Sequence, residues 1–306
     1  MDFDPRPYIK EIARGPHGRR DLTREQAREL FAAIFAGRVG EAPLGGILVA
    51  LRMKNEALDE IAGMMEALAP HVAPLRLPSG ARALLLASYN GARKLANLVP
   101  LLALRLAREG VPVLVHGVAQ EPSRVTTFDV LARLGHPACA SLEEAERRLE
   151  GERIACVPLS LLSPALARVV DMRLVMGVRN TGHTLAKLLL PANVEPHSAC
   201  RLVSVTHPDF LGLMRGYFAA VPGDALLLRG VEGEPVVRLH APQTIEALGG
   251  AGAVELRIDA AEAGYPLPER DADSTARWTR EVIEGRTAAP LALAAEASLI
   301  ARHCRR

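Results

Sequence analysis

The chain is poor in aromatic residues. Phenylalanine, tryptophan and tyrosine make up 4% of its 306 residues, and Trp278 is the single tryptophan. Proteins that bind single-stranded nucleic acid by stacking need aromatic rings on which the bases can lie. Few such rings are available here, so we expect any binding of a polyanion to be dominated by charge.

Cysteine is also scarce. The four cysteines are scattered, and none has the Cys-x-x-Cys spacing of a zinc or redox site. This content predicts a reducing, cytoplasmic environment with no disulfide framework and no metal site. No apolar run approaches the length that a membrane span needs, and the N-terminus lacks the basic-then-apolar layout of an export signal. We therefore expect a cytoplasmic protein with no membrane partner.

The formal net charge of +2, from 37 basic and 35 acidic residues, does not by itself indicate nucleic acid. The distribution of charge is more informative. Residues 80–138 hold seven basic and three acidic side chains, and residues 163–201 hold five and two. Two local excesses of positive charge give mild support to an anionic partner.

The chain changes pattern near residue 80. Residues 22–70 have the apolar spacing of helices and open with a capping box at Thr23 and Gln26. A proline-containing segment from about 70 to 80 then indicates a linker. Beyond it, short apolar runs alternate with helical patterns, which predicts a mainly parallel sheet. These runs lie at 83–87, 111–115, 154–159, 202–206 and 225–228. Residues from about 163 to 190 return to a continuous helical pattern.

The first apolar run leads into a turn with the context of an anion site. Residues 88–94 read Ser-Tyr-Asn-Gly-Ala-Arg-Lys, and we expect a helix to open near Leu95. Backbone N–H groups at such a junction point outward together with the positive end of the helix dipole. Only Gly91 remains as a glycine, while Arg93 and Lys94 add two cations to the first helical turn. We predict a site that holds phosphate by charge; the alternative is an ordinary turn with a solvated basic pair.

Several segments resemble the anthranilate phosphoribosyltransferase family, within the wider group that includes pyrimidine nucleoside phosphorylases. Residues 47–54, Ile-Leu-Val-Ala-Leu-Arg-Met-Lys, and residues 59–63, Asp-Glu-Ile-Ala-Gly, are the most specific match. Residues 177–180, Gly-Val-Arg-Asn, resemble the family's Gly-Val-Arg-Thr segment. The resemblance covers nearly the whole chain.

The resemblance implies the family's α/β fold, the class III phosphoribosyltransferase fold, with a small helical domain of two sequence segments and a larger α/β domain with a mainly parallel sheet. We expect the helical domain at residues 1–76, joined by about 163–192. We expect the α/β domain at residues 80–162 and 193–306. The resemblance also implies a homodimer that forms through the helical domain.

Three of the family's functional motifs are altered. The family binds phosphoribosyl pyrophosphate with Gly-Thr-Gly-Gly-Asp, where this chain has side chains that crowd a site needing close backbone approach. The lysine that precedes His-Gly is absent before His116, and Val118 and Ala119 follow it. The Asp-Glu pair that holds magnesium is replaced by Glu232 and Glu234, which we interpret as turn residues. These joint losses argue against the family's reaction.

The altered loop resembles that of the YbiB-type branch of the family, which carries Ser-Tyr-Asn-Gly-Ala-Arg-Lys. This resemblance implies a homodimer that binds nucleic acid with little sequence preference. The leading hypothesis is therefore a DNA- or RNA-binding protein that contacts the phosphate backbone through a basic groove and uses no cofactor. Whether it prefers DNA or RNA, and single or double strands, stays open.

The candidate binding residues come from both basic segments. On one continuous helix, Arg173 and Lys187 would be about four turns apart and would share a face. Tyr89 is the one attractive stacking platform. We predict no catalytic residue and interpret His116 as structural. The full predicted set is Tyr89, Asn90, Gly91, Arg93, Lys94, Arg124, Arg173, Arg179 and Lys187.

Two other functions stay open. One is a phosphoribosyltransferase or nucleoside phosphorylase with an altered substrate, in which weak magnesium binding by the remaining carboxylates is conceivable. The other is a phosphate sensor or scaffold. The joint loss of the glycine-rich loop and the acidic pair favours the binding protein over the transferase or phosphorylase, whereas nothing in the sequence excludes the sensor or scaffold.

Overall fold

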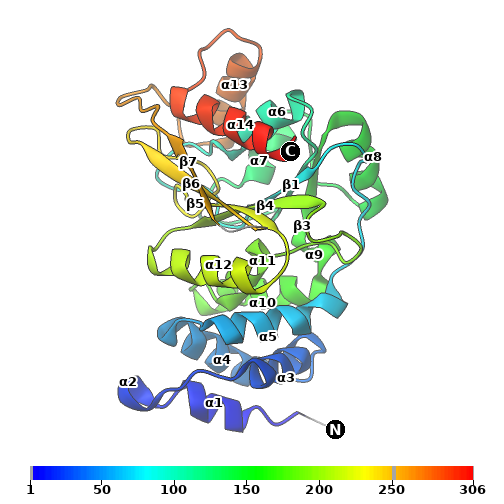
Figure 1. Cartoon of the computed structure of the whole chain (residues 1–306), viewed down its shortest axis with the longest axis vertical. Helices are drawn as coiled ribbons and strands as arrows, with labels where there is room; N and C mark the ends of the chain where they lie inside the picture. The colour runs from blue at the N-terminus through cyan, green and yellow to red at the C-terminus, as the bar shows by residue number, and fades with distance from the viewer. Residues whose placement is uncertain (1–2, 250–252, 306) are drawn as a thin grey trace. The chain divides into compact units, whose positions relative to one another are not determined.

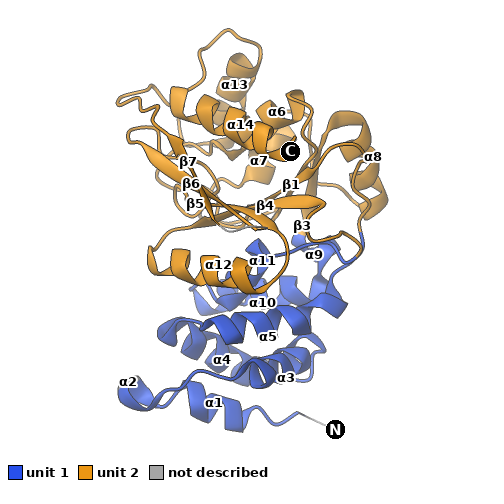
Figure 2. Cartoon of the chain, in the orientation of Figure 1, with its two compact units in different colours: residues 1–74, 159–192 blue, residues 75–158, 193–306 orange. Residues whose placement is uncertain are grey.

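The computed structural model describes residues 3–249 and 253–305, and the chain divides into two compact units (Figures 1 and 2). The helical unit comprises Met1–Pro74 and Leu159–Ala192, and the α/β unit comprises Leu75–Pro158 and Asn193–Arg306. The predicted second helical segment began at about 163. The observed one begins four residues earlier, because the short helix α9 (Leu159–Leu162) belongs to it.

The helical unit is built from short amphipathic helices. The capping box predicted at the start of α3 is present, since Thr23 Oγ1 accepts from Gln26 N and Gln26 Oε1 accepts from Thr23 N. Helices α3 and α5 pack so closely that a Cβ at Gly63 would lie 2.1 Å from Arg24 O. The elements of this unit besides α9 are α1 (Arg6–Ile12), α2 (Gly15–Gly18), α3 (Arg24–Phe35), α4 (Glu41–Lys54), α5 (Leu58–Leu68), a 3-10 turn at Ala69–His71, α10 (Pro164–Met176) and α11 (Thr181–Lys187).

The segment with the most specific family match, residues 47–63, holds a buried ion pair. Lys54 Nζ lies 2.6 Å from Glu60 Oε2 and 2.5 Å from Asp21 Oδ1. Glu60 Oε1 accepts from Leu22 N at 2.8 Å, and Glu60 is fully buried. Because burying a charge is costly unless it is paired and hydrogen-bonded, these residues fix how α4, α5 and the start of α3 meet.

The continuous helix predicted from about 163 to 190 is wrong. Helix α10 ends at Met176, and Gly177 takes the left-handed conformation with φ 71°. Asn180 then caps a second helix, α11, by accepting from Gly182 N at 2.9 Å. The fourteen-residue spacing of Arg173 and Lys187 therefore does not place them on one helix face.

The α/β unit contains one seven-stranded sheet with the order β3-β2-β1-β4-β5-β6-β7. The first five strands in that order are parallel, while β6 and β7 are antiparallel to their neighbours. Its strands are β1 (Ala83–Ser88), β2 (Val113–Gly117), β3 (Ile154–Pro158), β4 (Ala199–Val205), β5 (Asp224–Arg229), β6 (Gln243–Leu248) and β7 (Val254–Ile258). Its helices are α6 (Val99–Arg108), α7 (Thr127–Arg133), α8 (Leu142–Glu152), α12 (Asp209–Ala220), α13 (Ala272–Ile283) and α14 (Leu291–Cys304). The predicted fold class, a helical domain with a larger and mainly parallel α/β domain, is confirmed.

The sequence missed the two antiparallel strands. Both lie toward the edge of the sheet, and β7 buries Ile258 alone. β6 opens with the polar residues Gln243 and Thr244, and one of its buried residues is the charged Glu246. Neither strand therefore forms the continuous apolar run that marks a strand covered on both faces.

The strand order reverses between β1 and β4, which are neighbours in the sheet. In open α/β sheets, ligands bind at the carboxyl ends of the strands at such a switch point. Helices α6, α13 and α14 cover one face of the sheet and α12 lies on the other (Figure 1). The turn after β1 and the loop after β5 both leave the carboxyl edge near this point.

Helix α6 begins at Val99 and not near Leu95. Asn97 Oδ1 accepts from Val99 N at 3.1 Å, and Pro100 stands in the first helical turn, where its missing N–H costs nothing. Arg93 and Lys94 therefore precede the helix by several residues. The prediction that these two cations lie in the first helical turn is wrong.

No helix within residues 3–249 and 253–305 is both long enough and apolar enough to span a membrane.

Candidate functional site

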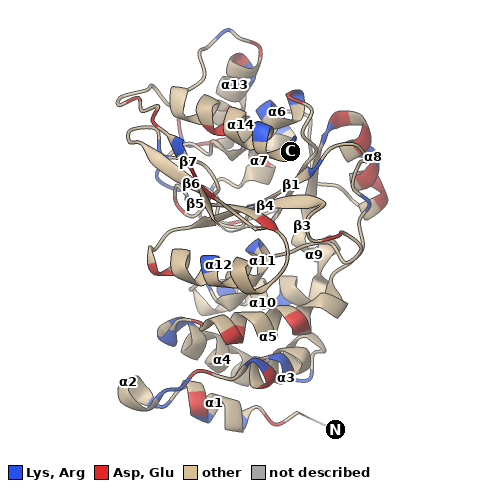
Figure 3. Ribbon diagram, in the orientation of Figure 1, with Lys and Arg blue, Asp and Glu red and all other residues tan. Residues whose placement is uncertain are grey.

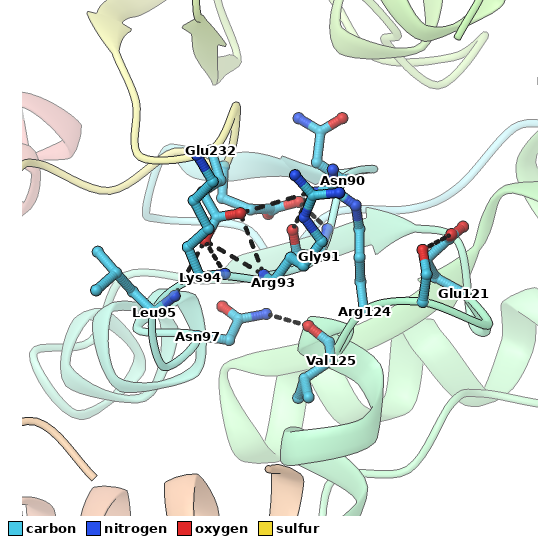
Figure 4. Close-up of polar contacts among 12 residues, drawn as sticks. Asn90, Gly91, Arg93, Lys94, Leu95, Asn97, Glu121, Arg124, Val125 and Glu232 are labelled. Atoms are coloured by element: carbon cyan, nitrogen blue, oxygen red, sulfur yellow. Dashed lines mark hydrogen bonds and ion pairs between the residues drawn. The ribbon is translucent and has the colours of Figure 1, made fainter. Parts of the chain in front are cut away.

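Two carboxylates of the α/β unit occupy the turn after β1 (Figure 4). Glu234 Oε1 accepts from the backbone nitrogens of Asn90, at 2.6 Å, and Gly91, at 2.7 Å. Glu234 Oε2 lies 2.5 Å from Ser88 Oγ. Glu234 is 2% exposed, so this carboxylate is an internal part of the turn.

Glu232 occupies the other half of the turn. Its carboxylate accepts from the backbone nitrogens of Lys94, at 2.8 Å, and of Arg93 and Leu95, each at 3.2 Å. Arg124 lies behind it, with its guanidinium 3.8 Å from Glu232 Oε2 and 3.1 Å from Gly91 O. The two carboxylates together take five backbone N–H groups, which we call the carboxylate clasp (Glu232 and Glu234 on residues 90–95).

The backbone on both sides of the clasp is in uncommon conformations. Glu232 has φ 54°, a left-handed conformation that is costly for a residue with a Cβ. Ser204 Oγ donates to Gly233 O at 2.7 Å and supports this loop from β4. Gly91 has φ 63°, and a Cβ there would lie 3.0 Å from Val125 O. The clasp is thus held by tertiary contacts from both the turn and the loop.

The clasp overturns two sequence predictions. We predicted Asn90 and Gly91 among the phosphate-binding residues, yet both are buried and their N–H groups are bound by Glu234. We also interpreted Glu232 and Glu234 as turn residues only, whereas their carboxylates accept the hydrogen bonds of the backbone N–H groups in the turn after β1. The signal that could have found them is an acidic pair in a glycine-containing loop after a central strand.

Tyr89 is not a stacking platform, because it is fully buried. Its hydroxyl lies 2.7 Å from Nδ1 of His116, at the end of the neighbouring strand β2. Burial lowers the pKa of His116 to about 3 and raises the pKa of Tyr89. A neutral imidazole bonded to a phenol ties the ends of β1 and β2 together.

The side chains of Arg93 and Lys94, in contrast, are exposed. A third exposed cation that sequence reasoning missed, Arg270, has its guanidinium 3.5 Å from Arg93 O. The two arginines are 177 residues apart in the chain, so no local pattern links them. Figure 3 shows basic and acidic positions interspersed over both units, with α8 rich in acidic ones. The three cations at this turn are therefore a local cluster, which we call the turn cations (Arg93, Lys94 and Arg270).

The second basic segment forms a cluster of its own in the helical unit. His183, on α11, is 6% exposed, and burial lowers its pKa to about 3. The nearby charges of Arg173, Arg179 and Lys187 lower it further. These three predicted residues therefore lie within electrostatic range of one histidine, although two helices and a connecting segment carry them. Their meeting with the turn cations of the other unit stays a prediction.

The carboxylates do not fit a magnesium site in this arrangement. A magnesium ion bound to a diphosphate needs one or two carboxylate ligands with open oxygens. Glu232 and Glu234 instead accept hydrogen bonds from six groups of the turn, five backbone nitrogens and Ser88 Oγ. Among the described residues, no group of three or more histidine, cysteine, aspartate or glutamate side chains is placed to hold a metal ion. We derive no step through magnesium.

Comparison with known proteins places the chain in a family. Residues 6–71 match the helical bundle domain of a glycosyl transferase family. The chain is 38% identical to the "Uncharacterized protein YbiB" of Escherichia coli K12 over 294 residues, which cover 95% of this chain and 91% of that protein. It is 28% identical to the anthranilate phosphoribosyltransferase of Beijerinckia indica, over 93% of this chain and 82% of that one. The chain belongs to the anthranilate phosphoribosyltransferase-like family.

Solved structures agree with this membership. The anthranilate phosphoribosyltransferase of Thermus thermophilus superposes on this chain with a TM-score of 0.75 at 27% identity. The match covers 98% of this chain and 88% of the Thermus chain. The anthranilate phosphoribosyltransferase of Saccharomyces cerevisiae, solved in complex with PRPP and Mg, superposes with a TM-score of 0.74 at 15% identity. The match covers 98% of this chain and 87% of the yeast chain, so the two share the fold. Family membership favours the transferase alternative, whereas the clasp distinguishes this chain's turn from an open phosphate site.

Proposed function

We propose that this chain binds the phosphate backbone of nucleic acid through side-chain cations, with little sequence preference, on a phosphoribosyltransferase fold whose diphosphate turn is closed. One observation carries the proposal. In the turn after β1 the backbone N–H groups are bound internally, while the side chains of Arg93 and Lys94 are exposed. The exposed side chains of the turn cations can therefore bind an anion, whereas the backbone N–H groups of the turn are already occupied by carboxylates.

The two ligand classes make different demands on such a turn. A small diphosphate is held by backbone N–H groups that close around it, as at other strand–turn–helix sites. A nucleic acid strand is held from outside by long cationic side chains, which contribute affinity without reading the bases. Arg93, Lys94 and Arg270 suit the second mode. Arg173, Arg179 and Lys187 of the helical unit stay predicted contacts of the phosphate backbone.

Salt dependence tests the proposal. Binding of a short fluorescent single strand and of a duplex is followed by anisotropy at several salt concentrations. Each phosphate contact contributes roughly −0.9 to the slope of log K against log salt on duplex DNA. Changing Arg93 and Lys94 to alanine should flatten the slope by about one to two units and weaken all sequences nearly equally.

A matched control uses two exposed arginines elsewhere in the α/β unit, Arg147 on α8 and Arg257 on β7. Their double alanine variant should bind almost as tightly as the unmodified protein. Equal losses from both pairs would show diffuse surface charge and overturn the proposed site. Absence of binding at low salt would overturn the function itself.

The second candidate is phosphoribosyl transfer with an altered substrate. Family membership favours it, since relatives 27–29% identical over most of the chain are named anthranilate phosphoribosyltransferases. It requires that both clasp carboxylates leave the turn when substrate binds. Binding of phosphoribosyl pyrophosphate decides between the two candidates.

We also propose a homodimer through the helical unit. Helix α4 exposes Val49 and Met53, one helical turn apart, and the end of α10 exposes Leu174 and Val175, the latter 82% exposed. Arg52 of α4 donates to Arg179 O at 2.9 Å, so α4 lies beside the segment that directly follows α10. An apolar patch of this kind on a surface is typical of an interface, and a second copy of the same patch is a complementary partner. A cytoplasmic location stays a prediction from the cysteine content.

A further inference from the structure

A cavity of about 340 Å³ lies in the α/β unit beside the turn cations. Its walls are mainly apolar, and three short segments supply them. The lining residues used below are Leu95, Glu232, Arg238, Leu239, Glu262 and Tyr265. The volume falls in the range of small-molecule sites, roughly 300–1,000 Å³, and such sites combine apolar walls with a few polar groups.

The cavity walls are held in place by hydrogen bonds. Glu262 N donates to Leu239 O at 2.6 Å and joins two of the wall segments. Tyr265 OH donates to Ala288 O at 2.6 Å and fixes the ring. Glu232 belongs both to the wall and to the clasp, so the third segment is tied to the turn. The cavity is therefore preformed.

The mouth of the cavity adjoins the cations. Leu95, which is 47% exposed, lines the cavity and directly follows Lys94 in the chain. In Figure 4 its side chain points away from Arg124 and Val125. A phosphate bound to Arg93 or Lys94 would place the next groups of its chain beside this opening.

The charges of the wall select what can enter. The charged or titratable residues that line the cavity are Glu232, Glu262, Arg238 and His240. Two carboxylates disfavour a phosphate inside. An uncharged ring with an N–H group suits Glu262, whose carboxylate accepts one bond from Leu291 N and has further lone pairs to accept another. Tyr265 adds an aromatic wall against which a flat ring can stack.

We propose that this cavity receives one unpaired nucleobase of a strand whose phosphates lie on the turn cations. The inference rests on the proposed function and deepens it, because it names single-stranded nucleic acid as the preferred partner. The cavity also supplies an aromatic ring for stacking, that of Tyr265. Base–aromatic stacking tolerates any sequence, because every base has a π-face.

The experiment compares two labelled strands with the same number of phosphates, one of deoxyadenosine and one made abasic at every position. The unmodified protein should bind the base-containing strand about tenfold more tightly, as stacking of one base implies. In Leu239→Trp, which fills the cavity, the two strands should bind alike. The control Val254→Trp, at a 59% exposed site on β7, should keep the tenfold difference.

Thermal unfolding first establishes that each variant folds. Tyr265→Leu provides a second test that keeps the cavity apolar and removes the ring, and it should also abolish the difference. Equal binding of both strands by the unmodified protein overturns the cavity proposal and leaves the proposed function intact. Absence of binding to either strand overturns both. Free adenosine that binds as tightly as the strand would make the cavity a nucleoside site and overturn the strand proposal.

Discussion

The carboxylate of Glu234 lies 2.6 Å from the backbone nitrogen of Asn90, although 144 residues separate the two in the chain. The same side chain also binds Gly91 N and Ser88 Oγ. The turn after β1 is therefore completed by a residue from the loop after β5. This relationship accounts for how a turn with one glycine keeps its backbone donors satisfied.

Glu234→Gln should lower the free energy of unfolding by about 2–3 kcal/mol. An amide is uncharged, so the substitution leaves the buried N–H groups of the turn without a charged partner. Chemical denaturation measures the change. Glu232→Gln is the matched control and should cost about 1 kcal/mol or less, because Arg93 and Lys94, whose N–H groups Glu232 binds, are exposed residues at which water can replace a lost hydrogen bond. Equal costs would contradict a structural role specific to Glu234.

Phosphoribosyl pyrophosphate should bind poorly, because the five backbone donors of the turn are already bound by the clasp. Titration calorimetry with the diphosphate and magnesium should show no binding at micromolar concentration. Glu232→Ala frees the N–H groups of Arg93, Lys94 and Leu95, so this variant should bind inorganic pyrophosphate more tightly than the unmodified protein does. Micromolar binding by the unmodified protein, with turnover of an aromatic amine, would establish the transferase instead.

Glu296 should make the protein less stable as pH rises toward 8. This side chain of α14 is fully buried, its Oε2 accepts from Val237 N at 3.1 Å, and burial raises its pKa to about 8. Between the ordinary pKa of a glutamate and pH 8, the folded state holds a proton that the unfolded state has lost. Stability from this group is complete at acid pH and falls by up to about 1.4 kcal/mol per pH unit.

Unfolding measured between pH 6.5 and 8 tests this sign. Glu296→Gln cannot titrate, so its stability should decline less over that interval than that of the unmodified protein. The exposed Glu255 on β7 offers a control, and Glu255→Gln should leave the pH profile unchanged. A profile for Glu296→Gln that parallels the unmodified protein would show that this carboxyl does not retain its proton.

Val175→Glu combined with Met53→Glu should yield a monomer. The two side chains are 82% and 71% exposed on the patch proposed to form the dimer, and a carboxylate buried at an apolar interface is strongly disfavoured. Light scattering should give a mass near 32.8 kDa for the double variant and about twice that for the unmodified protein. Leu291→Glu, 58% exposed in the α/β unit, should stay dimeric. A monomeric unmodified protein at micromolar concentration would contradict the proposal.

The sequence by itself determined the parts of the fold that local patterns encode. The capping box at Thr23 forms as predicted, because its partners are three residues apart. The five parallel strands lie close to the five apolar runs, since strands covered on both faces need continuous apolar residues. Strands β6 and β7, the last two toward one edge of the sheet, lack that pattern and were not predicted. The cations at Arg93 and Lys94 could be read directly from the chain.

Only the tertiary structure decided what those residues do. Tyr89 reads as an exposed ring in a turn, yet it is buried against His116, 27 residues away. Glu232 and Glu234 read as turn residues, yet they bind donors well over a hundred residues earlier in the chain. The reason is physical: a backbone N–H must find a partner when buried, but any acceptor that the fold brings near can serve. The spacing of residues along the chain determines the periodicity of helices and strands and the residues that cap helices. Which distant side chain accepts from a given N–H group depends instead on where the strands lie in the sheet.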